Sequence, residues 1–342
     1  MKSHLGDDGP SLGVVKRKKS TLQMGLVFGD VQDDLCKVEE SLSSLAKVDP
    51  LWLSAPLQYT LDGGGKRLRP ALTLLAGRSY RYDLDLLVPM ATAVELLHIA
   101  SLVHDDTVDG SAVRRGKATV SAVWGKTTAV LLGDYLFANA AELVSGTRNV
   151  DVMRLFAQTL MTMANSQLGE ASTVFDLGQT REGYYERIGG KTASLFSMAT
   201  ESGARLSGAS DDEVIALRNY GANFGLAFQI VDDVLDFTGD ENELGKPVGS
   251  DLVQGILTLP AIILLERSSH DNPVRHLLEN RGGEEYLKAA TDMIRSSSVP
   301  DECYSVAAEF VTQACSYIQD LPDRATRQAL VNLAEYSISR RK

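Results

Sequence analysis

The residues best suited to chemistry in this chain are aspartates that recur with one internal spacing. The pattern D-D-x-x-D occurs twice, at Asp105, Asp106, Asp109, Asp232, Asp233 and Asp236. On an α-helix, positions i, i+1 and i+4 lie within roughly 100° of arc, so each motif places three carboxylates on one face. A solvated acidic helix end explains one such motif, but two copies call for a shared function.

The segments before both motifs argue against solvated ends. Residues 90–103 and 224–231 are apolar almost all round, which is typical of buried helices. Carboxylates at the end of a buried helix are costly unless cations compensate them. Oxygen ligands suit Mg²⁺, which binds one or two carboxylates together with waters and substrate phosphates. The two motifs therefore predict a phosphorylated substrate that is held through metal ions.

A basic segment, GGGKRLRP at residues 63–70, is the second strong signal. Three glycines let the backbone approach a ligand closely, and Lys66, Arg67 and Arg69 follow them. Backbone N–H groups with lysine and arginine form an anion cradle, although this is not a Walker loop. His98 precedes Asp105 by two helical turns and so shares its face; a buried core histidine is the alternative interpretation.

Further donors flank both acidic motifs. Arginine gives bidentate contacts to phosphate, and lysine, threonine and glutamine side chains also donate to phosphate oxygens. These residues are Arg114, Arg115, Lys191, Thr192, Gln229 and Lys246. The sequence thus predicts two kinds of phosphate site, one dependent on metal and one formed by basic residues.

The elements that must position these residues are predicted to be helices. Helical patterns follow one another from about residue 26, with short glycine-rich breaks and no useful strand alternation. Aromatic residues make up only 6 % of the chain, which favours helix over sheet. We expect a flexible tail at residues 1–25 and a single all-α domain at residues 26–342.

Composition excludes several classes of protein. The net charge of −11 disfavours general nucleic-acid binding. Three cysteines without metal spacing indicate a reducing compartment and no disulfide framework. We find no uninterrupted run of apolar residues long enough for a transmembrane helix and no signal peptide, so we expect a cytoplasmic protein.

In its motifs the sequence resembles the trans-type (all-E) polyprenyl diphosphate synthases, over roughly residues 26–340. The resemblance is carried by GGGKRLRP, ELLHIASLVHDDTVDGSAVRRG, LLGDYL, GGKTASLF, FQIVDDVLDFTGD and LGKPVGSDL, in the family's order. It implies an all-α isoprenoid-synthase fold with helices around a central hydrophobic cavity, usually in a homodimer. It also implies a Mg²⁺-dependent prenyltransferase that repeatedly condenses an allylic diphosphate with isopentenyl diphosphate.

The resemblance also implies roles for the individual residues. It assigns the six aspartates to Mg²⁺ on the allylic diphosphate, with three ions per site and Mn²⁺ as a substitute. It assigns the same diphosphate to Arg114, Lys191, Thr192, Gln229 and Lys246. It assigns isopentenyl diphosphate to Lys66, Arg69, His98 and Arg115. It implies that metal ions neutralise the departing diphosphate and that apolar helices form the walls of a tunnel that excludes water. It also implies peripheral contact with a membrane when the product is released.

Product length should depend on what blocks this tunnel below the first motif. Members that stop at farnesyl commonly have aromatics at the positions of Ala100 and Ser101, and Leu97 and Val94 lie deeper. The opposing helix is expected to begin at residue 133, where Ala141 replaces a phenylalanine frequent in long-chain relatives. We therefore predict a C35–C50 product, as for quinone side chains. One departure is Ile256, where many short-chain members have lysine.

Three other functions fit part of the pattern. A geranylgeranyl or farnesyl diphosphate synthase would perform the same chemistry and stop earlier. A class I terpene cyclase would share D-D-x-x-D but lack GGGKRLRP. A silent regulatory subunit would typically have lost aspartates from one or both motifs, whereas here both are intact.

Overall fold

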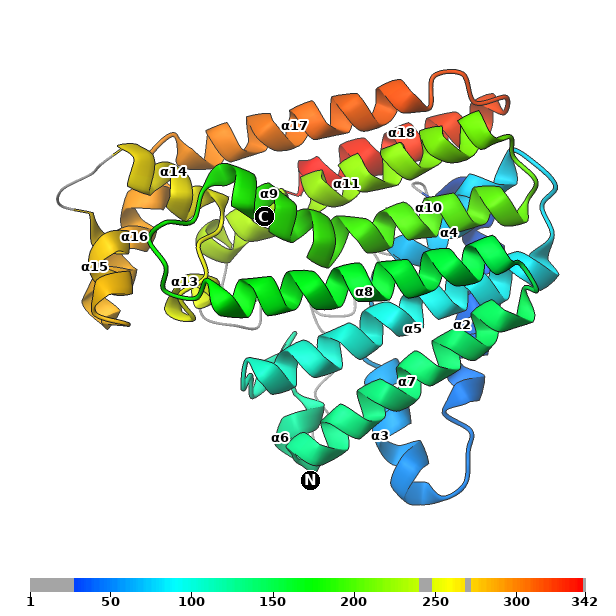
Figure 1. The fold of residues 1–342 in the computed structure, drawn as a ribbon, viewed down its shortest axis with the longest axis horizontal. Coiled ribbons are helices and arrows are strands. Elements are labelled where there is room, and N and C mark those ends of the chain that lie inside the picture. Colours follow the sequence, from blue (N-terminus) through cyan, green and yellow to red (C-terminus); the bar gives the residue numbers. More distant parts are fainter. Residues whose placement is uncertain (1–27, 240–247, 268–271, 341–342) are drawn as a thin grey trace, which may run out of the picture.

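The structure is a computed structural model that describes residues 28–239, 248–267 and 272–340. Within these ranges the chain is helical almost throughout (Figure 1). The helical elements are η1 (Gly29–Val31), α2 (Gln32–Leu45), α3 (Leu51–Leu61), α4 (Leu68–Arg78), α5 (Leu84–Val108), α6 (Val120–Trp124), α7 (Lys126–Gly146), α8 (Val150–Ser172), α9 (Arg181–Ile188), η2 (Gly189–Ala193), α10 (Ser194–Leu206), α11 (Asp211–Thr238), α13 (Ser250–Val253), α14 (Leu259–Arg267), α15 (Pro273–Glu279), α16 (Glu284–Ser296), α17 (Val299–Tyr317) and α18 (Arg324–Ser339).

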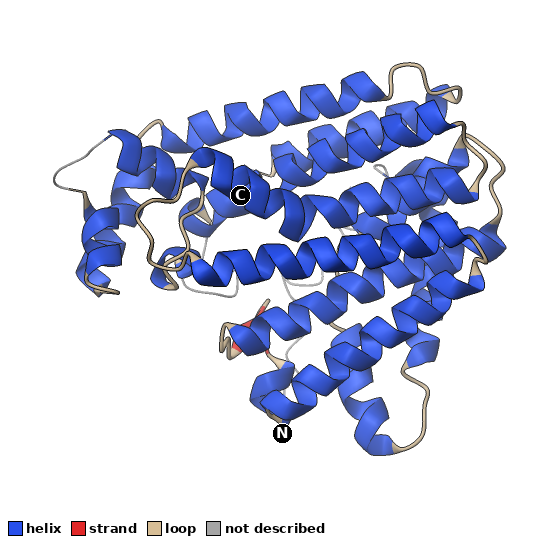
Figure 2. Cartoon of the chain, in the orientation of Figure 1, coloured by secondary structure: helices blue, strands red, loops and turns tan. Residues whose placement is uncertain are grey.

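A single short hairpin interrupts the helices in the part of the chain that the structure describes (Figure 2). Strands β1 (Val113–Arg114) and β2 (Lys117–Ala118) pair in antiparallel fashion. Arg115 and Gly116 at its tip have φ values of 51° and 74°. Positive φ at both central residues is the requirement of the tight turn whose twist matches a two-stranded ribbon.

Helices α5 and α11 occupy the centre of the fold and each carries one aspartate motif. Helix α5 packs against α2, α4, α7 and α10, and α11 packs against α10, α17 and α18 (Figure 1). Helix α11 begins with a capping box, in which Ser210 and Glu213 satisfy each other's backbone N–H groups. The central position of both helices agrees with the apolar segments that precede the motifs.

Close packing brings the GGKTA segment against α11. A Cβ atom added at Gly225 would lie 2.5 Å from the Cα atom of Ala193, so only glycine permits this approach. The GGKTA segment itself forms η2, a π-helical turn between α9 and α10. Such turns are rare and occur often at functional sites. The packing places Lys191 and Thr192 beside the helix of the second motif.

The predicted all-α fold is confirmed, but one boundary is wrong. The helix opposite α5 begins at Lys126, not at residue 133. The predicted tail, residues 1–25, lies outside the described residues. Helix α5 is long and apolar enough to cross a membrane, yet 67 % of its most apolar stretch is buried inside the protein, as in the core helix of a soluble protein.

Candidate active site

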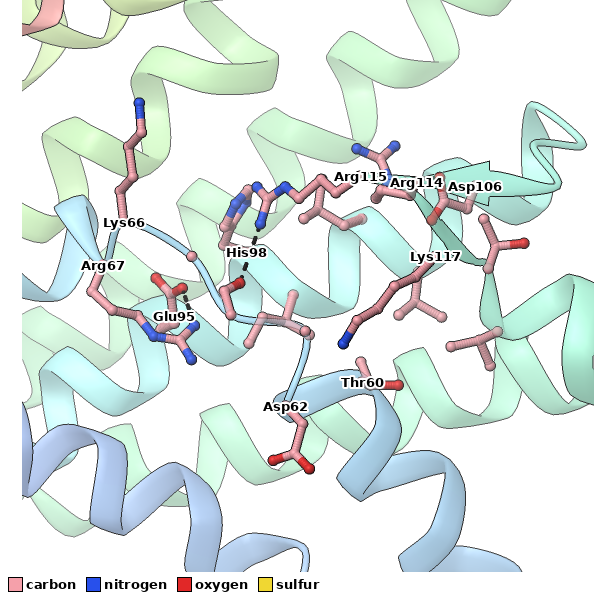
Figure 3. A pocket seen from close by; sticks show the side chains of 18 of the residues that line it. Thr60, Asp62, Lys66, Arg67, Glu95, His98, Asp106, Arg114, Arg115 and Lys117 are labelled. Atoms are coloured by element: carbon pink, nitrogen blue, oxygen red, sulfur yellow. Dashed lines mark hydrogen bonds and ion pairs between the residues drawn. The ribbon is translucent and has the colours of Figure 1, made fainter. Parts of the chain in front are cut away.

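A cavity of about 660 Å³ lies between the glycine-rich loop, α5, the hairpin and α11 (Figure 3). The loop contributes Lys66 and Arg69, while α5 contributes His98 and Asp106. The cavity is lined by further side chains from the hairpin, α11 and the C-terminal end, namely Arg114, Arg115, Lys117, Phe228, Asp232 and Arg340. One aspartate from each motif therefore faces a space that is otherwise rich in cations.

Two basic side chains of this cavity, Lys66 and Arg69, are poorly neutralised. The pKa of Arg69 is lowered to about 10 by burial, which outweighs the effects of its charged neighbours. Burial lowers the pKa of Lys66, and Arg340 lowers it further. The Nε atom of Arg69 is buried and has no hydrogen-bond partner among the described residues. Cations that are buried together in this way favour an anion as their partner.

His98 is neutral in this environment. Burial and then the nearby guanidinium groups of Arg69, Arg115 and Arg114 hold its pKa well below the usual value. A neutral imidazole offers one N–H donor and one acceptor. His98 is therefore an uncharged hydrogen-bonding group that is surrounded by charged arginines.

Arg67 and Arg115 show how the glycine-rich loop is held. Arg67 forms ion pairs with Glu39 and, at 2.7 Å, with Glu95, so its charge is already neutralised within the protein. Arg115 donates through Nη1 to the backbone carbonyl of Gly64 at 3.2 Å. The loop and the hairpin are therefore joined beside the cavity. Arg67 lines the cavity as well, but its charge is already compensated by Glu39 and Glu95.

The first motif lies at the C-terminal end of α5, with Asp109 as the capping residue. Burial raises the pKa of Asp105 to about 6, and Lys191 opposes this rise while Asp109 adds to it. Asp106 is buried and its Oδ1 atom accepts from Arg114 Nε at 2.7 Å. The three carboxylates of this motif are therefore not equivalent, because one is paired within the protein.

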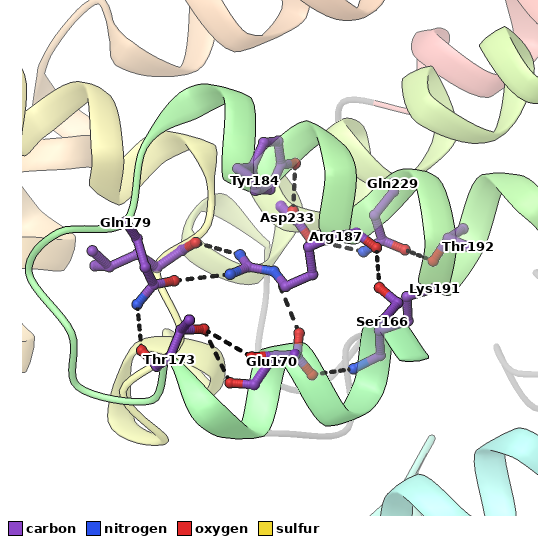
Figure 4. Close-up of polar contacts among 12 residues, drawn as sticks. Ser166, Glu170, Thr173, Gln179, Tyr184, Arg187, Lys191, Thr192, Gln229 and Asp233 are labelled. Atoms are coloured by element: carbon purple, nitrogen blue, oxygen red, sulfur yellow. Dashed lines mark hydrogen bonds and ion pairs between the residues drawn. The ribbon is translucent and has the colours of Figure 1, made fainter. Parts of the chain in front are cut away.

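The second motif is held by a hydrogen-bond network around Asp233 (Figure 4). Tyr184 donates to its Oδ2 atom at 2.6 Å and Gln229 donates to its Oδ1 atom at 2.7 Å. Burial raises the pKa of Asp233 to about 7, with Asp251 adding to the effect. Asp232 instead pairs with Arg340 at 3.0 Å, and Asp236 accepts from Ser250 at 3.0 Å.

The two donors predicted in the GGKTA segment have different partners. Thr192 donates through Oγ1 to Gln229 at 2.8 Å, which extends the network of Asp233. Lys191 pairs with Glu170 of α8 at 2.5 Å. Burial opposes the charge of Lys191, but Glu170 and Asp105 outweigh it and raise its pKa. Lys246 lies outside the described residues.

Within the described residues, no group of three or more His, Cys, Asp or Glu side chains is arranged so that it could hold a metal ion. The motifs therefore do not form a protein-only cage. Mg²⁺ ordinarily retains waters and substrate oxygens and needs only a few carboxylates, so this arrangement fits an ion that binds together with a phosphorylated ligand.

A family-wide sequence profile described as Polyprenyl synthetase matches residues 50–294. The chain belongs to the polyprenyl synthetase family. The predicted family, the isoprenoid-synthase fold and the trans-prenyltransferase class are thereby confirmed.

Individual relatives of this polyprenyl synthetase agree. It is 36 % identical over 318 residues to solanesyl-diphosphate synthase 2, chloroplastic, of Oryza sativa subsp. japonica, covering 91 % of this chain and 78 % of the relative. It is 32 % identical over 321 residues to heptaprenyl diphosphate synthase component 2 of Bacillus subtilis (strain 168), covering 94 % and 92 %. Its fold matches a polyprenyl synthase of Caulobacter crescentus CB15, solved with calcium and isoprenyl diphosphate, with a TM-score of 0.87, 35 % identity and coverage of 91 % and 96 %.

The residues predicted to set chain length in this polyprenyl synthetase lie apart from the polar cavity. Val94, Leu97 and Ala100 are fully buried. Ser101 is half-buried, and its hydroxyl donates a hydrogen bond to the His98 carbonyl at 2.8 Å. None of them lines the polar cavity. Ala141 lies on α7, which packs against α5, and its side chain is exposed.

Several polar residues of the site were missed from the sequence. Glu170 contacts Lys191, Tyr184 contacts Asp233, and Arg187 contacts Glu170. Near the glycine-rich loop and the second motif, Glu95 contacts Arg67 and Arg340 contacts Asp232. Glu170 and Lys191 are 21 positions apart, and Tyr184 and Asp233 are 49 positions apart. No short-range spacing signals contacts of this kind.

Proposed function

We propose that the chain condenses an allylic diphosphate repeatedly with isopentenyl diphosphate to give an all-trans polyprenyl diphosphate of C35–C50. We propose that residues 26–342 act as one catalytic domain. The observation that carries the proposal is that two different candidate sites for a diphosphate lie next to each other. One is the acidic pair of helix ends on α5 and α11, and the other is the cluster of cations on the glycine-rich loop and hairpin.

The allylic diphosphate is assigned to the acidic site with Mg²⁺. The carboxylates that would hold the metal are those of the two motifs, Asp105, Asp106, Asp109, Asp232, Asp233 and Asp236. Several of them have partners within the protein: Asp106 is paired with Arg114, Asp232 with Arg340, and Asp233 accepts from Tyr184 and Gln229. When bound, Mg²⁺ neutralises the departing diphosphate. Burial, with a smaller contribution from repulsion by Asp109, raises the pKa of Asp105, which fits a site made for cations. Three ions per site, with Mn²⁺ as substitute, belong to the same proposal.

The allylic diphosphate is proposed to be bound, around these ions, by Lys191, Thr192, Gln229, Lys246 and Arg114. Lys191 supplies a point charge. Thr192 donates to Gln229, and Gln229 in turn donates to the Asp233 carboxylate. Arg114 is positioned by Asp106 and can turn its remaining guanidinium N–H groups toward phosphate oxygens.

Isopentenyl diphosphate is assigned to Lys66, Arg69, His98 and Arg115. The unpartnered Nε atom of Arg69 and the lowered pKa of Lys66 both favour a bound dianion or trianion here. Neutral His98 donates a hydrogen bond without adding charge. The two substrates would then meet over α5, where apolar lining side chains such as Phe228 would help to exclude water.

The growing chain is proposed to extend along the face of α5 that carries Ser101, Ala100, Leu97 and Val94. These side chains are small or aliphatic, so none of them is an aromatic block below Asp105. A product longer than C20 follows from this. The names of the solanesyl and heptaprenyl relatives support the same range.

The active form is proposed to be a homodimer. Helices α7 and α8 expose apolar side chains that a second copy would cover, namely Val130, Leu131, Val150, Met153, Met161 and Leu168. A cytoplasmic location, with peripheral membrane contact for release of an apolar product, completes the proposal.

Product analysis tests the function directly. The full chain is incubated with farnesyl diphosphate, labelled isopentenyl diphosphate and Mg²⁺, and the prenyl chain length is measured. We expect C35–C50 products, and no product from Asp105→Ala or Asp232→Ala. Termination at C15 or C20 would replace the proposal with a short-chain synthase. Formation of a cyclic product without use of isopentenyl diphosphate would indicate a cyclase. Absence of activity unless a partner protein is added would indicate a silent subunit.

A further inference from the structure

Glu170 is a buried acidic residue that lies against the predicted diphosphate site (Figure 4). It is 8 % exposed and sits in the last turns of α8. Its Oε1 atom lies 2.5 Å from Lys191 Nζ. A buried carboxylate is retained only where its partners are well placed, because the charge has lost its hydration. The position of the Lys191 ammonium is thus tied to Glu170.

The second oxygen of Glu170 is held from the other side. Arg187 Nε lies 3.4 Å from Glu170 Oε2, and the Arg187 side chain is 10 % exposed. Arg187 also donates to Gln179 Oε1 at 2.8 Å and to the Leu257 carbonyl at 2.5 Å. With its guanidinium fixed at three points, Arg187 anchors Glu170, and Glu170 in turn presents one oxygen to Lys191.

Without this anchor, Lys191 would face a different set of charges. Asp105 and Asp109 of the first motif both attract its ammonium. A lysine ammonium is a mobile point charge on a flexible stem, so it follows the nearest carboxylate. A lysine drawn onto Asp105 would occupy carboxylate oxygens that the metal and the diphosphate need.

We propose that Glu170 is a positioning residue for the prenyl-transfer reaction, which holds the Lys191 ammonium at the allylic diphosphate and away from the first aspartate motif. This inference rests on the proposed function, since it requires Lys191 to bind the allylic diphosphate. Glu170 acts through Lys191 and contacts neither substrate.

A double-mutant cycle tests the inference in the full chain. The variants are Glu170→Ala, Lys191→Ala and the double variant, with Glu170→Gln as the conservative replacement and the exposed Glu186→Ala as the control. We expect Glu170→Ala to raise the KM of farnesyl diphosphate roughly tenfold, as for loss of a charge-assisted contact, and to leave the KM of isopentenyl diphosphate unchanged. Glu170→Gln should recover part of the loss, because its amide oxygen still accepts from Lys191.

The decisive comparison is the effect of Glu170→Ala in the two backgrounds. If Glu170 acts through Lys191, adding Glu170→Ala to Lys191→Ala raises the KM of farnesyl diphosphate no further. Independent, multiplicative effects would overturn the inference and assign Glu170 a role of its own, such as metal binding. Thermal melting identifies any variant that does not fold. If Glu170→Ala does not fold, Glu170→Gln replaces it in the cycle, and the same two outcomes are compared.

The cycle also separates the inference from the proposed function. If Lys191→Ala leaves the KM of farnesyl diphosphate unchanged, the positioning role is overturned, because there is nothing for Glu170 to position. Formation of polyprenyl products by the unaltered chain would still support the prenyltransferase. A Glu170→Ala variant that behaves like Glu186→Ala would overturn the inference alone.

Discussion

The guanidinium of Arg340 lies 3.0 Å from the Asp232 carboxylate, which joins the C-terminal end of the described chain to the second aspartate motif. The Arg340 side chain is only 12 % exposed and stacks 4.3 Å above the centre of the Phe228 ring. It also lines the cavity that contains Lys66 and Arg69. The residue that caps the C-terminal end of α18 therefore contributes a cation to a cavity whose other lining residues lie between positions 59 and 232.

Replacing Arg340 should weaken binding in this cavity. We expect Arg340→Ala to raise the KM of isopentenyl diphosphate by about tenfold, because one cation is lost and the Asp232 charge is left uncompensated beside the incoming diphosphate. Steady-state kinetics with each substrate varied in turn measures the effect. Arg324→Ala, an exposed arginine on the same helix, is the matched control. An unchanged KM in Arg340→Ala would contradict the prediction.

The adjacent arginines of the hairpin should affect different substrates. Arg114 is directed toward the first motif by Asp106, whereas Arg115 is directed toward the glycine-rich loop by Gly64. We therefore expect Arg114→Ala to raise the KM of the allylic diphosphate and Arg115→Ala to raise that of isopentenyl diphosphate, each roughly tenfold. The division is wrong if both variants raise the KM of the same substrate only.

The stability of the metal-free protein should depend on Asp233 as the pH changes. Burial raises its pKa to about 7 in the folded chain, against an ordinary value of 3.8. Protonated Asp233 thus stabilises the fold fully below about pH 4, and this contribution is lost as the pH rises toward about 7. Tyr184, Gln229, Asp232 and Asp251 are the groups that face it.

Thermal melting of metal-free wild type and Asp233→Asn between about pH 5 and 8 measures this dependence. Asparagine cannot ionise, so the Tm of the variant relative to wild type should increase as the pH rises. The same increase in an exposed control, Asp212→Asn, would show that the effect does not arise from the buried carboxylate.

Removal of divalent metal should abolish activity. We expect a chelator to stop product formation and added Mg²⁺ to restore it, since the aspartates alone repel a diphosphate. Asp105→Asn and Asp232→Asn should need a higher Mg²⁺ concentration for half-maximal rate. Full activity in the presence of excess chelator would refute the metal assignment.

Product length should respond to bulk on one face of α5. We expect Ala100→Phe, and more weakly Ser101→Phe, to shorten the products, because the ring would fill the path below Asp105. Ala141→Phe should leave the product length unchanged, since this side chain is exposed on α7. Chromatography of the dephosphorylated products measures the distribution. Equal distributions from Ala100→Phe and wild type would show that this face does not line the path.

Much of the site could be predicted from local sequence because helix geometry is local. The spacing within Asp105, Asp106 and Asp109 already fixed three carboxylates at one helix end, and the apolar segment before them indicated a buried helix. The start of α7 was predicted too late. Its first turn contains Thr127 and Thr128, which are weak helix formers, and packing against α5 overrides that preference.

The sequence by itself determined which chemistry the chain can perform, since residue types and short spacings define the two acidic motifs and the basic segment. Only the tertiary structure decided how the charges are distributed among them. It paired Asp106 with Arg114, tied Asp233 to Tyr184, and placed Glu170 against Lys191. The physical reason is that a buried charge takes whichever partner the packing of distant helices brings within a few ångströms, and sequence separation does not encode that distance.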